Sequence, residues 1–129
     1  MIDFEKFLQE CNAQKKIDKL SKKYRNKRII LFGIDDFCIT ILKNYDLSKL
    51  NIIAISDIEN NSKLKTQQLD FKYINSKDLS LIDADLILIS NYDYNKSLIK
   101  LDDEILYLSK NSNIEIRPLI NLTFVDLFL

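Results

Sequence analysis

The spacing of apolar residues changes several times along the chain and divides it into helical and extended segments. From Phe4 to Tyr24 apolar residues recur at intervals near three or four, with Lys and Gln between them, which predicts one amphipathic helix. Beyond it come short, continuous apolar runs, which are typical of strands covered on both faces. These runs predict strands at RIILF (28–32), NIIAIS (51–56) and ADLILIS (84–90), and shorter or mixed segments predict a short strand at FKYIN (71–75) and a last strand within NIEIRPLI (113–120).

Helical or polar segments separate these strands. A helix is predicted from Asp35 or Asp36 to about Asn44, a short helix at 76–82 with Ser76 as its N-cap, and a long helix from about Asn95 to Lys110. Residues 58–68 are polar and without periodicity, which indicates a loop, with a short helix within it as the alternative.

Strands that alternate with helices imply right-handed crossovers and a parallel sheet. We therefore expect an α/β fold with a doubly wound, mostly parallel, five-stranded Rossmann-like sheet. Residues 1–26 would form an extra N-terminal amphipathic helix, and residues 27–129 a single globular Rossmann-like domain. Ligands in such sheets bind beyond the carboxyl ends of the strands, where the strand order reverses. That point is expected between strands 28–32 and 84–89.

Composition and charge argue against several classes of function. The chain has 129 residues, 47% of them hydrophobic and 29% charged, which is typical of one soluble domain. Nineteen basic residues balance nineteen acidic ones, so no net positive field favours nucleic acid. The start lacks a signal-peptide pattern and no apolar stretch is long enough for a membrane span, so a cytoplasmic protein is expected. The abundance of Lys, Asn and Ile is typical of an AT-rich bacterial genome.

The sequence lacks the residues that several kinds of catalytic and metal sites require. The sequence has no histidine, which removes histidine-based acid–base catalysis and histidine metal sites. Cys11 and Cys38 lie on separate elements, so we expect two buried thiols and neither a disulfide nor a metal site. The basic run of residues 15–28 is interpreted as a solvated helix face, with an anionic partner or membrane surface as the alternative.

The turn after the first strand carries the strongest functional signal. Gly33 is the single glycine of the chain and occupies the first place of a G-x-G-x-x-G pattern, and Asp57 follows it by 57 − 33 = 24 residues. That interval is close to the roughly 20 residues expected for an acid that binds ribose. Asp35 and Cys38 fill the other two glycine places. Asp35 would repel a diphosphate or cap the following helix in its place, and the small Cys38 would allow close packing of helix on strand.

From Lys27 to Ser90 the segments KRIILFG, IIAISD, FKYINSKDL and ADLILIS resemble the Rossmann-like N-terminal domains of bacterial nucleotide-sugar dehydratases and epimerases and of sugar acyltransferases. The resemblance implies binding of a nicotinamide dinucleotide, NAD(P), or of a nucleotide-sugar, with Gly33 at the phosphates and Asp57 on ribose. It also implies a link to polysaccharide or nucleotide-sugar metabolism. The cofactor itself is not identified.

The predicted ligand-binding residues all follow strands of the expected sheet. They are Gly33, Ile34, Asp35, Asp36, Asp57, Ser90 and Asn91. Each has a structural alternative: Asp57 as a turn residue, and Ser90, Asn91 and Tyr92 as ordinary loop and cap residues. Lys63 and Lys65 are interpreted as solvated loop residues, with a phosphate contact as the alternative. Tyr92 and Lys96 have the spacing of a Tyr-x-x-x-Lys reductase pair, a weak motif.

Two functions remain open. The first is a domain that binds a nucleotide-type ligand without catalysis of its own, and the second is a structural or protein-interaction domain whose nucleotide pocket is lost. A free-standing oxidoreductase ranks below both, because no catalytic set is visible. The apolar tail, residues 122–129, either packs on the sheet or forms a homodimer contact.

Overall fold

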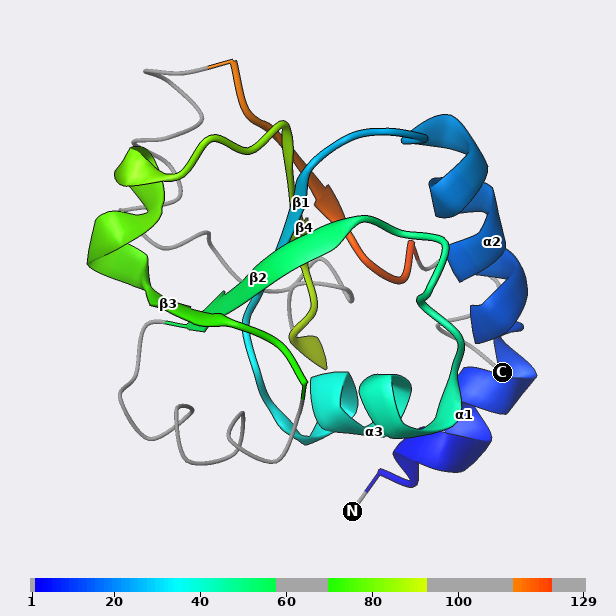
Figure 1. The fold of residues 1–129 in the computed structure, drawn as a ribbon. Coiled ribbons are helices and arrows are strands. Elements are labelled where there is room, and N and C mark those ends of the chain that lie inside the picture. Colours follow the sequence, from blue (N-terminus) through cyan, green and yellow to red (C-terminus); the bar gives the residue numbers. More distant parts are fainter. Residues whose placement is uncertain (1, 58–69, 93–112, 122–129) are drawn as a thin grey trace.

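The computed structural model describes residues 2–57, 70–92 and 113–121. In these residues five strands form one parallel sheet in the order β3-β2-β1-β4-β5 (Figure 1). The strands are β1 (Ile29–Phe32), β2 (Ile52–Asp57), β3 (Tyr73–Asn75), β4 (Leu86–Ile89) and β5 (Glu115–Pro118). The helices are α1 (Phe4–Glu10), α2 (Ala13–Lys23), α3 (Asp36–Asn44) and the short 3₁₀ helix η1 (Ser76–Leu81).

The central strand is β1, which pairs with β2 on one side and with β4 on the other. All four residues of β1 and all four of β4 are buried, as the continuous apolar runs predict. The strand order reverses between β1 and β4, where the sequence analysis placed the reversal. The predicted α/β class and parallel sheet are therefore confirmed.

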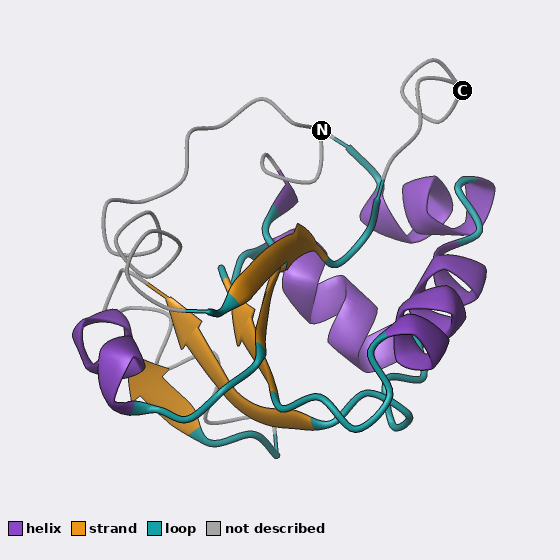
Figure 2. Cartoon of the chain, turned by 90° about the horizontal axis from the view of Figure 1, so that it is seen from above, coloured by secondary structure: helices purple, strands orange, loops and turns teal. Residues whose placement is uncertain are grey.

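Alternate residues of each central strand face opposite sides of the sheet. Leu31 and Leu88 belong to a buried cluster that includes residues of α1, α2 and α3. Ile30 and Ile87 belong to a second cluster, which includes Leu79 of η1. Figure 2 accordingly shows the three α-helices on one side of the sheet and η1 on the other.

The N-terminal segment contains two helices, so the prediction of one helix from Phe4 to Tyr24 was wrong. The chain turns at Asn12, whose φ of 58° is left-handed, and α1 and α2 lie on either side of this turn. Asparagine tolerates this conformation better than most residues. The buried residues Cys11 and Ala13 are only two positions apart, which already departs from helical spacing.

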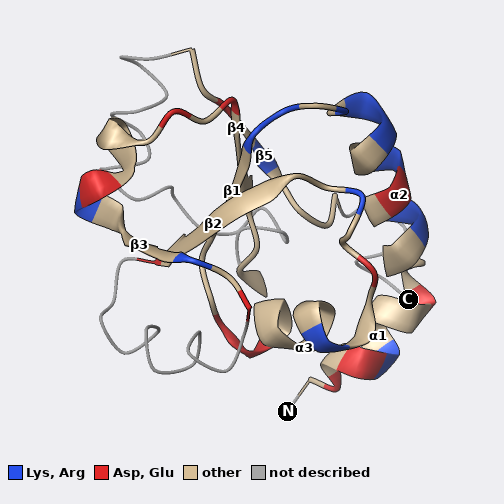
Figure 3. Ribbon diagram, viewed as in Figure 1, with Lys and Arg blue, Asp and Glu red and all other residues tan. Residues whose placement is uncertain are grey.

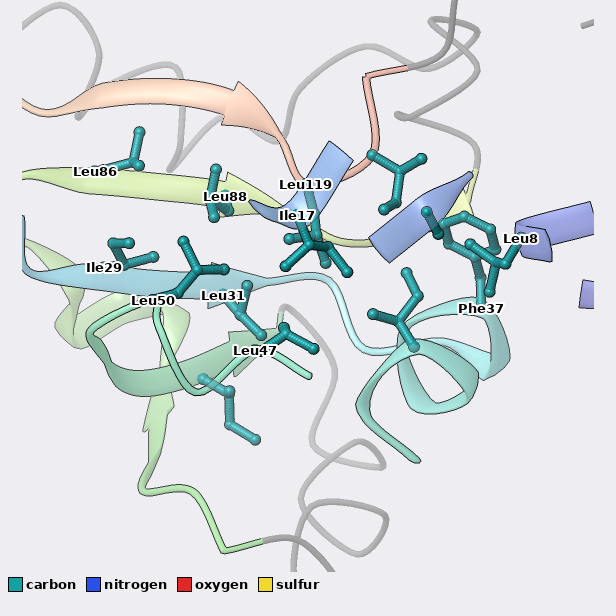
Figure 4. Packing of buried hydrophobic residues seen from close by; sticks show 14 of the residues in the cluster. Leu8, Ile17, Ile29, Leu31, Phe37, Leu47, Leu50, Leu86, Leu88 and Leu119 are labelled. Carbon is teal, nitrogen blue, oxygen red and sulfur yellow. The ribbon is translucent and has the colours of Figure 1, made fainter. Parts of the chain in front are cut away.

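Both N-terminal helices contribute to the main core. Leu8 and Ile17 are buried in the same cluster as Phe37 of α3 and Leu119, which follows β5 (Figure 4). Next to Ile17 in α2, the Lys16 side chain donates a hydrogen bond to the Asn121 carbonyl oxygen over 2.9 Å. The helix α2 is thereby anchored to the segment that follows the edge strand β5.

The predicted short helix after β3 is present as η1, but its cap differs from the prediction. The side chain of Asn75, one residue before Ser76, accepts the hydrogen bond from the Lys77 N–H. The helix predicted from Asn95 to Lys110, the loop at 58–68 and the tail at 122–129 lie outside the described residues. Among the helices that are described, none is long and apolar enough to cross a membrane.

Candidate functional site

The turn that follows β1, residues 33–36, is here called the glycine turn. Gly33 has a φ of 95°, a conformation that glycine adopts without steric cost. Its N–H donates to the Ser56 carbonyl oxygen over 3.0 Å. A Cβ atom at Gly33 would lie 3.1 Å from Cβ of Asn91. Both the backbone conformation and the close approach of Asn91 therefore favour glycine at this position.

Asp35 joins the glycine turn to the segment after β4. Its Oδ1 accepts a hydrogen bond from the Cys38 N–H at 2.9 Å, so the residue is the N-cap of α3, as predicted. Its Oδ2 accepts from the Tyr92 N–H at 2.8 Å. One half-buried carboxylate thus binds backbone donors from two separate parts of the chain.

Asp57 reaches the same turn from the end of β2. Its Oδ2 accepts a hydrogen bond from the Ile34 N–H at 2.7 Å. The Tyr73 hydroxyl donates to the Asp57 carbonyl oxygen at 3.4 Å, which connects this position to β3 as well. Gly33 and Asp57 therefore lie at one edge of the sheet, as expected from their strands.

Ser90 and Asn91 lie beside the glycine turn, at the end of β4. Ser90 is fully buried, and its hydroxyl lies 2.6 Å from the Gly33 carbonyl oxygen and 3.1 Å from that of Phe32. This hydroxyl therefore stabilises the backbone at the start of the glycine turn. The half-buried Asn91 packs against Gly33.

Burial controls the titration of two groups at this edge. It raises the pKa of the Asp35 carboxyl above its ordinary value, and the N–H donors of Tyr92 and Cys38 offset part of that rise. Burial also raises the pKa of the Cys38 thiol to about 12. Cys38 is consequently a small packing residue between helix and sheet, which agrees with the interpretation of the third glycine place.

An aromatic cluster lies against the same edge. The rings of Phe4 and Phe7, from α1, lie 5.1 and 5.8 Å from the Tyr92 ring between centroids. Phe37, in the first turn of α3, lies 5.2 Å from both Phe4 and Tyr92. The helix α1 therefore helps to hold the Tyr92 backbone where its N–H meets Asp35.

All seven predicted site residues lie in or beside the glycine turn, and Asp36 is exposed in the first turn of α3. Lys63, Lys65 and Lys96 lie outside the described residues. Sequence reasoning missed the Tyr92 N–H as a partner of Asp35, because a backbone donor has no signature in the sequence. Elsewhere in the described segments, no group of three or more His, Cys, Asp or Glu residues could hold a metal ion.

The site differs chemically from a phosphate-binding turn. In such a turn, backbone N–H groups at the start of the helix donate to phosphate oxygens. Here the Cys38 and Ile34 N–H groups donate to Asp35 and Asp57. The arrangement holds three strand ends together through carboxylates of the chain itself.

No protein-family model matches this sequence, and comparisons with curated proteins and with solved structures also return no match.

Proposed function

We propose that this chain is a non-catalytic Rossmann-like domain with a structural or protein-interaction role, in which the Asp35 carboxylate takes the place of a bound phosphate. The observation that carries the proposal is the double hydrogen bond of Asp35, from the Cys38 N–H at the start of α3 and from the Tyr92 N–H after β4.

Two physical arguments support this proposal. A phosphate at the glycine turn would have to displace Asp35 from both donors, and each charge-assisted bond of this kind contributes more than a neutral one. The displaced carboxylate, together with Asp57, would also repel the incoming negative charge. The Ile34 and Cys38 N–H groups are thus already paired with carboxylates of the chain, and a diphosphate would find both opposing charge and occupied donors.

A second candidate is binding of a nucleotide-type ligand, either NAD(P) or a nucleotide-sugar. It is favoured by the retained positive φ of Gly33 and by the position of Asp57 at the same turn, where a ribose-binding acid is expected. In this function the ligand would contact Asp57 with its sugar and keep its phosphates away from Asp35. A link to polysaccharide or nucleotide-sugar metabolism belongs to this candidate.

A ligand panel separates the two candidates. Wild type, Asp35→Ser and the control Asp36→Ser would each be heated with NAD, NADP, a UDP-sugar or coenzyme A. Serine can still cap α3, but it removes the charge and leaves the Tyr92 N–H without its carboxylate partner. The control removes the same charge one residue away, at an exposed position.

The proposal predicts no thermal shift for wild type or for the control. A ligand at about 100 times its dissociation constant stabilises by roughly 2.7 kcal/mol, which raises the melting temperature of a domain of this size by several degrees. A shift confined to Asp35→Ser, or none in any variant, supports the proposal. A shift of several degrees in wild type would contradict it and favour the nucleotide-binding candidate.

A homodimer formed through residues 122–129 is a separate proposal, which rests on the apolar sequence of that segment. Analytical ultracentrifugation of the intact chain tests it, and a strict monomer would contradict it. A cytoplasmic location and a bacterial origin likewise remain predictions from the sequence.

A further inference from the structure

The exposed side of α2 and the segment that joins it to β1 are rich in Lys and Arg and are here called the basic face. Figure 3 shows Lys and Arg along α2 and into the connection to β1. The basic face consists of the exposed residues Lys15, Lys19, Lys22, Lys23, Arg25 and Lys27. It includes no residue of the glycine turn, so the inference is independent of the function proposed above.

Charge is distributed unevenly between this segment and the rest of the chain. Residues 15–28 hold eight of the nineteen basic residues and one of the nineteen acidic ones. That acidic residue, Asp18, is half-buried and accepts a hydrogen bond from the Gln14 side chain at 3.1 Å. A chain without net charge therefore has one strongly positive side, which a count over the whole sequence conceals.

The fold fixes this surface in place. Ala13, Ile17 and Ser21 are buried on the inner side of α2, so the lysines at positions 15, 19 and 22 line its outer side at helical spacing. A helix of 11 residues extends over about 16 Å. Within the described part of the chain, Lys15, Lys19 and Lys22 form no ion pair. Their charge is thus available to an external partner.

We propose that the basic face docks on the surface of a bilayer that contains anionic lipid. Four of the six charged residues lie on the outer side of α2 and two in the connection that follows it, an arrangement that suits an extended negative surface. A bilayer surface attracts such a cluster by charge alone, and each Lys or Arg near it raises the affinity about five-fold.

Other partners fit this surface less well. Protein–protein interfaces deplete lysine and depend on buried aromatic or apolar anchors, whereas the six residues of the basic face are all Lys or Arg. Proteins that bind single-stranded nucleic acid use aromatic side chains as stacking platforms, and Tyr24, the aromatic residue within this segment, is buried.

Vesicle co-sedimentation tests the proposal. Wild type would be mixed at low ionic strength with vesicles of phosphatidylcholine alone, and with vesicles in which about one third of the lipid is phosphatidylserine. The test variant replaces three lysines of the basic face by glutamine. The control variant makes the same change in net charge at three exposed lysines elsewhere. The test positions are Lys15, Lys19 and Lys22, and the control positions are Lys43, Lys72 and Lys77.

Wild type and the control variant should sediment with the anionic vesicles only, and added salt should release them. The test variant should bind about 100-fold more weakly, and circular dichroism would verify that both variants are folded. Equal loss in the two variants, or no binding of wild type to anionic vesicles, would overturn the proposal. Binding of wild type to double-stranded DNA but not to vesicles would also overturn it, in favour of a nucleic-acid partner.

Discussion

Replacement of Gly33 by alanine tests the geometry on which the whole site depends. Gly33 has a φ of 95°, and an added Cβ would lie 3.1 Å from Cβ, 3.2 Å from Cγ and 3.2 Å from N of Asn91. A left-handed conformation costs alanine about 1–2 kcal/mol, and overpacking a tight site costs typically about 1–3 kcal/mol. Alanine also reduces the conformational entropy of the unfolded chain, which offsets about 0.4–1 kcal/mol of this loss of stability. We expect the free energy of unfolding to fall by about 3 kcal/mol.

Urea unfolding followed by far-ultraviolet circular dichroism measures this loss. With a slope of about 2 kcal/mol per molar urea, the midpoint should fall by about 1.5 M. A second variant, Asn91→Gly, separates the two contributions, because it removes the two side-chain atoms of Asn91 that face the new Cβ. The double variant should therefore lose about 1 kcal/mol less than the sum of the single variants. A loss below about 0.5 kcal/mol in Gly33→Ala would refute the argument.

Two further predictions concern titratable groups. The Arg28 side chain donates to the Asp85 carboxylate and holds its pKa at about 2, below the ordinary 3.8. The stability that this carboxylate contributes is therefore present above pH 3.8 and is lost as the pH falls toward 2. The melting temperature of Asp85→Asn should consequently fall less steeply than that of wild type over this pH interval. Parallel plots of melting temperature against pH would contradict this role of Asp85. Cys11 and Cys38 are 4% and 0% exposed, and burial raises the pKa of Cys38 to about 12. Neither thiol should react with Ellman's reagent at pH 8 until denaturant is added, and rapid labelling of native protein would show that one of them is accessible.

The sheet and the meeting of Gly33 with Asp57 were predictable, because both follow from general rules. Continuous apolar runs such as those of β1 and β4 occur in strands buried on both faces. The carboxyl ends of neighbouring parallel strands meet at one edge, so a residue that ends β2 lies close to the turn that follows β1. Sequence order and periodicity were sufficient for these conclusions.

The contact between Asp35 and Tyr92 could not be predicted in the same way. The two residues are 57 positions apart, and the donor is a backbone N–H, which every residue except proline carries. Its position depends on where β4 ends and on how α1 packs against the Tyr92 ring, which are both consequences of the complete fold. Sequence therefore predicted that Asp35 or Asp36 caps α3 but left the second partner of Asp35 unknown.

The anchoring of α2 to residues in and after β5 bears on the order in which the protein folds. Lys16 and Asn121 are separated by 105 residues, and Tyr24 donates to Glu115 across 91. During synthesis α1 and α2 emerge well before β5, the strand that completes their packing. Contacts between such distant residues slow folding, because a long loop must close before they form. The nascent chain must consequently keep the apolar side of α2 from aggregating until residue 121 has left the ribosome.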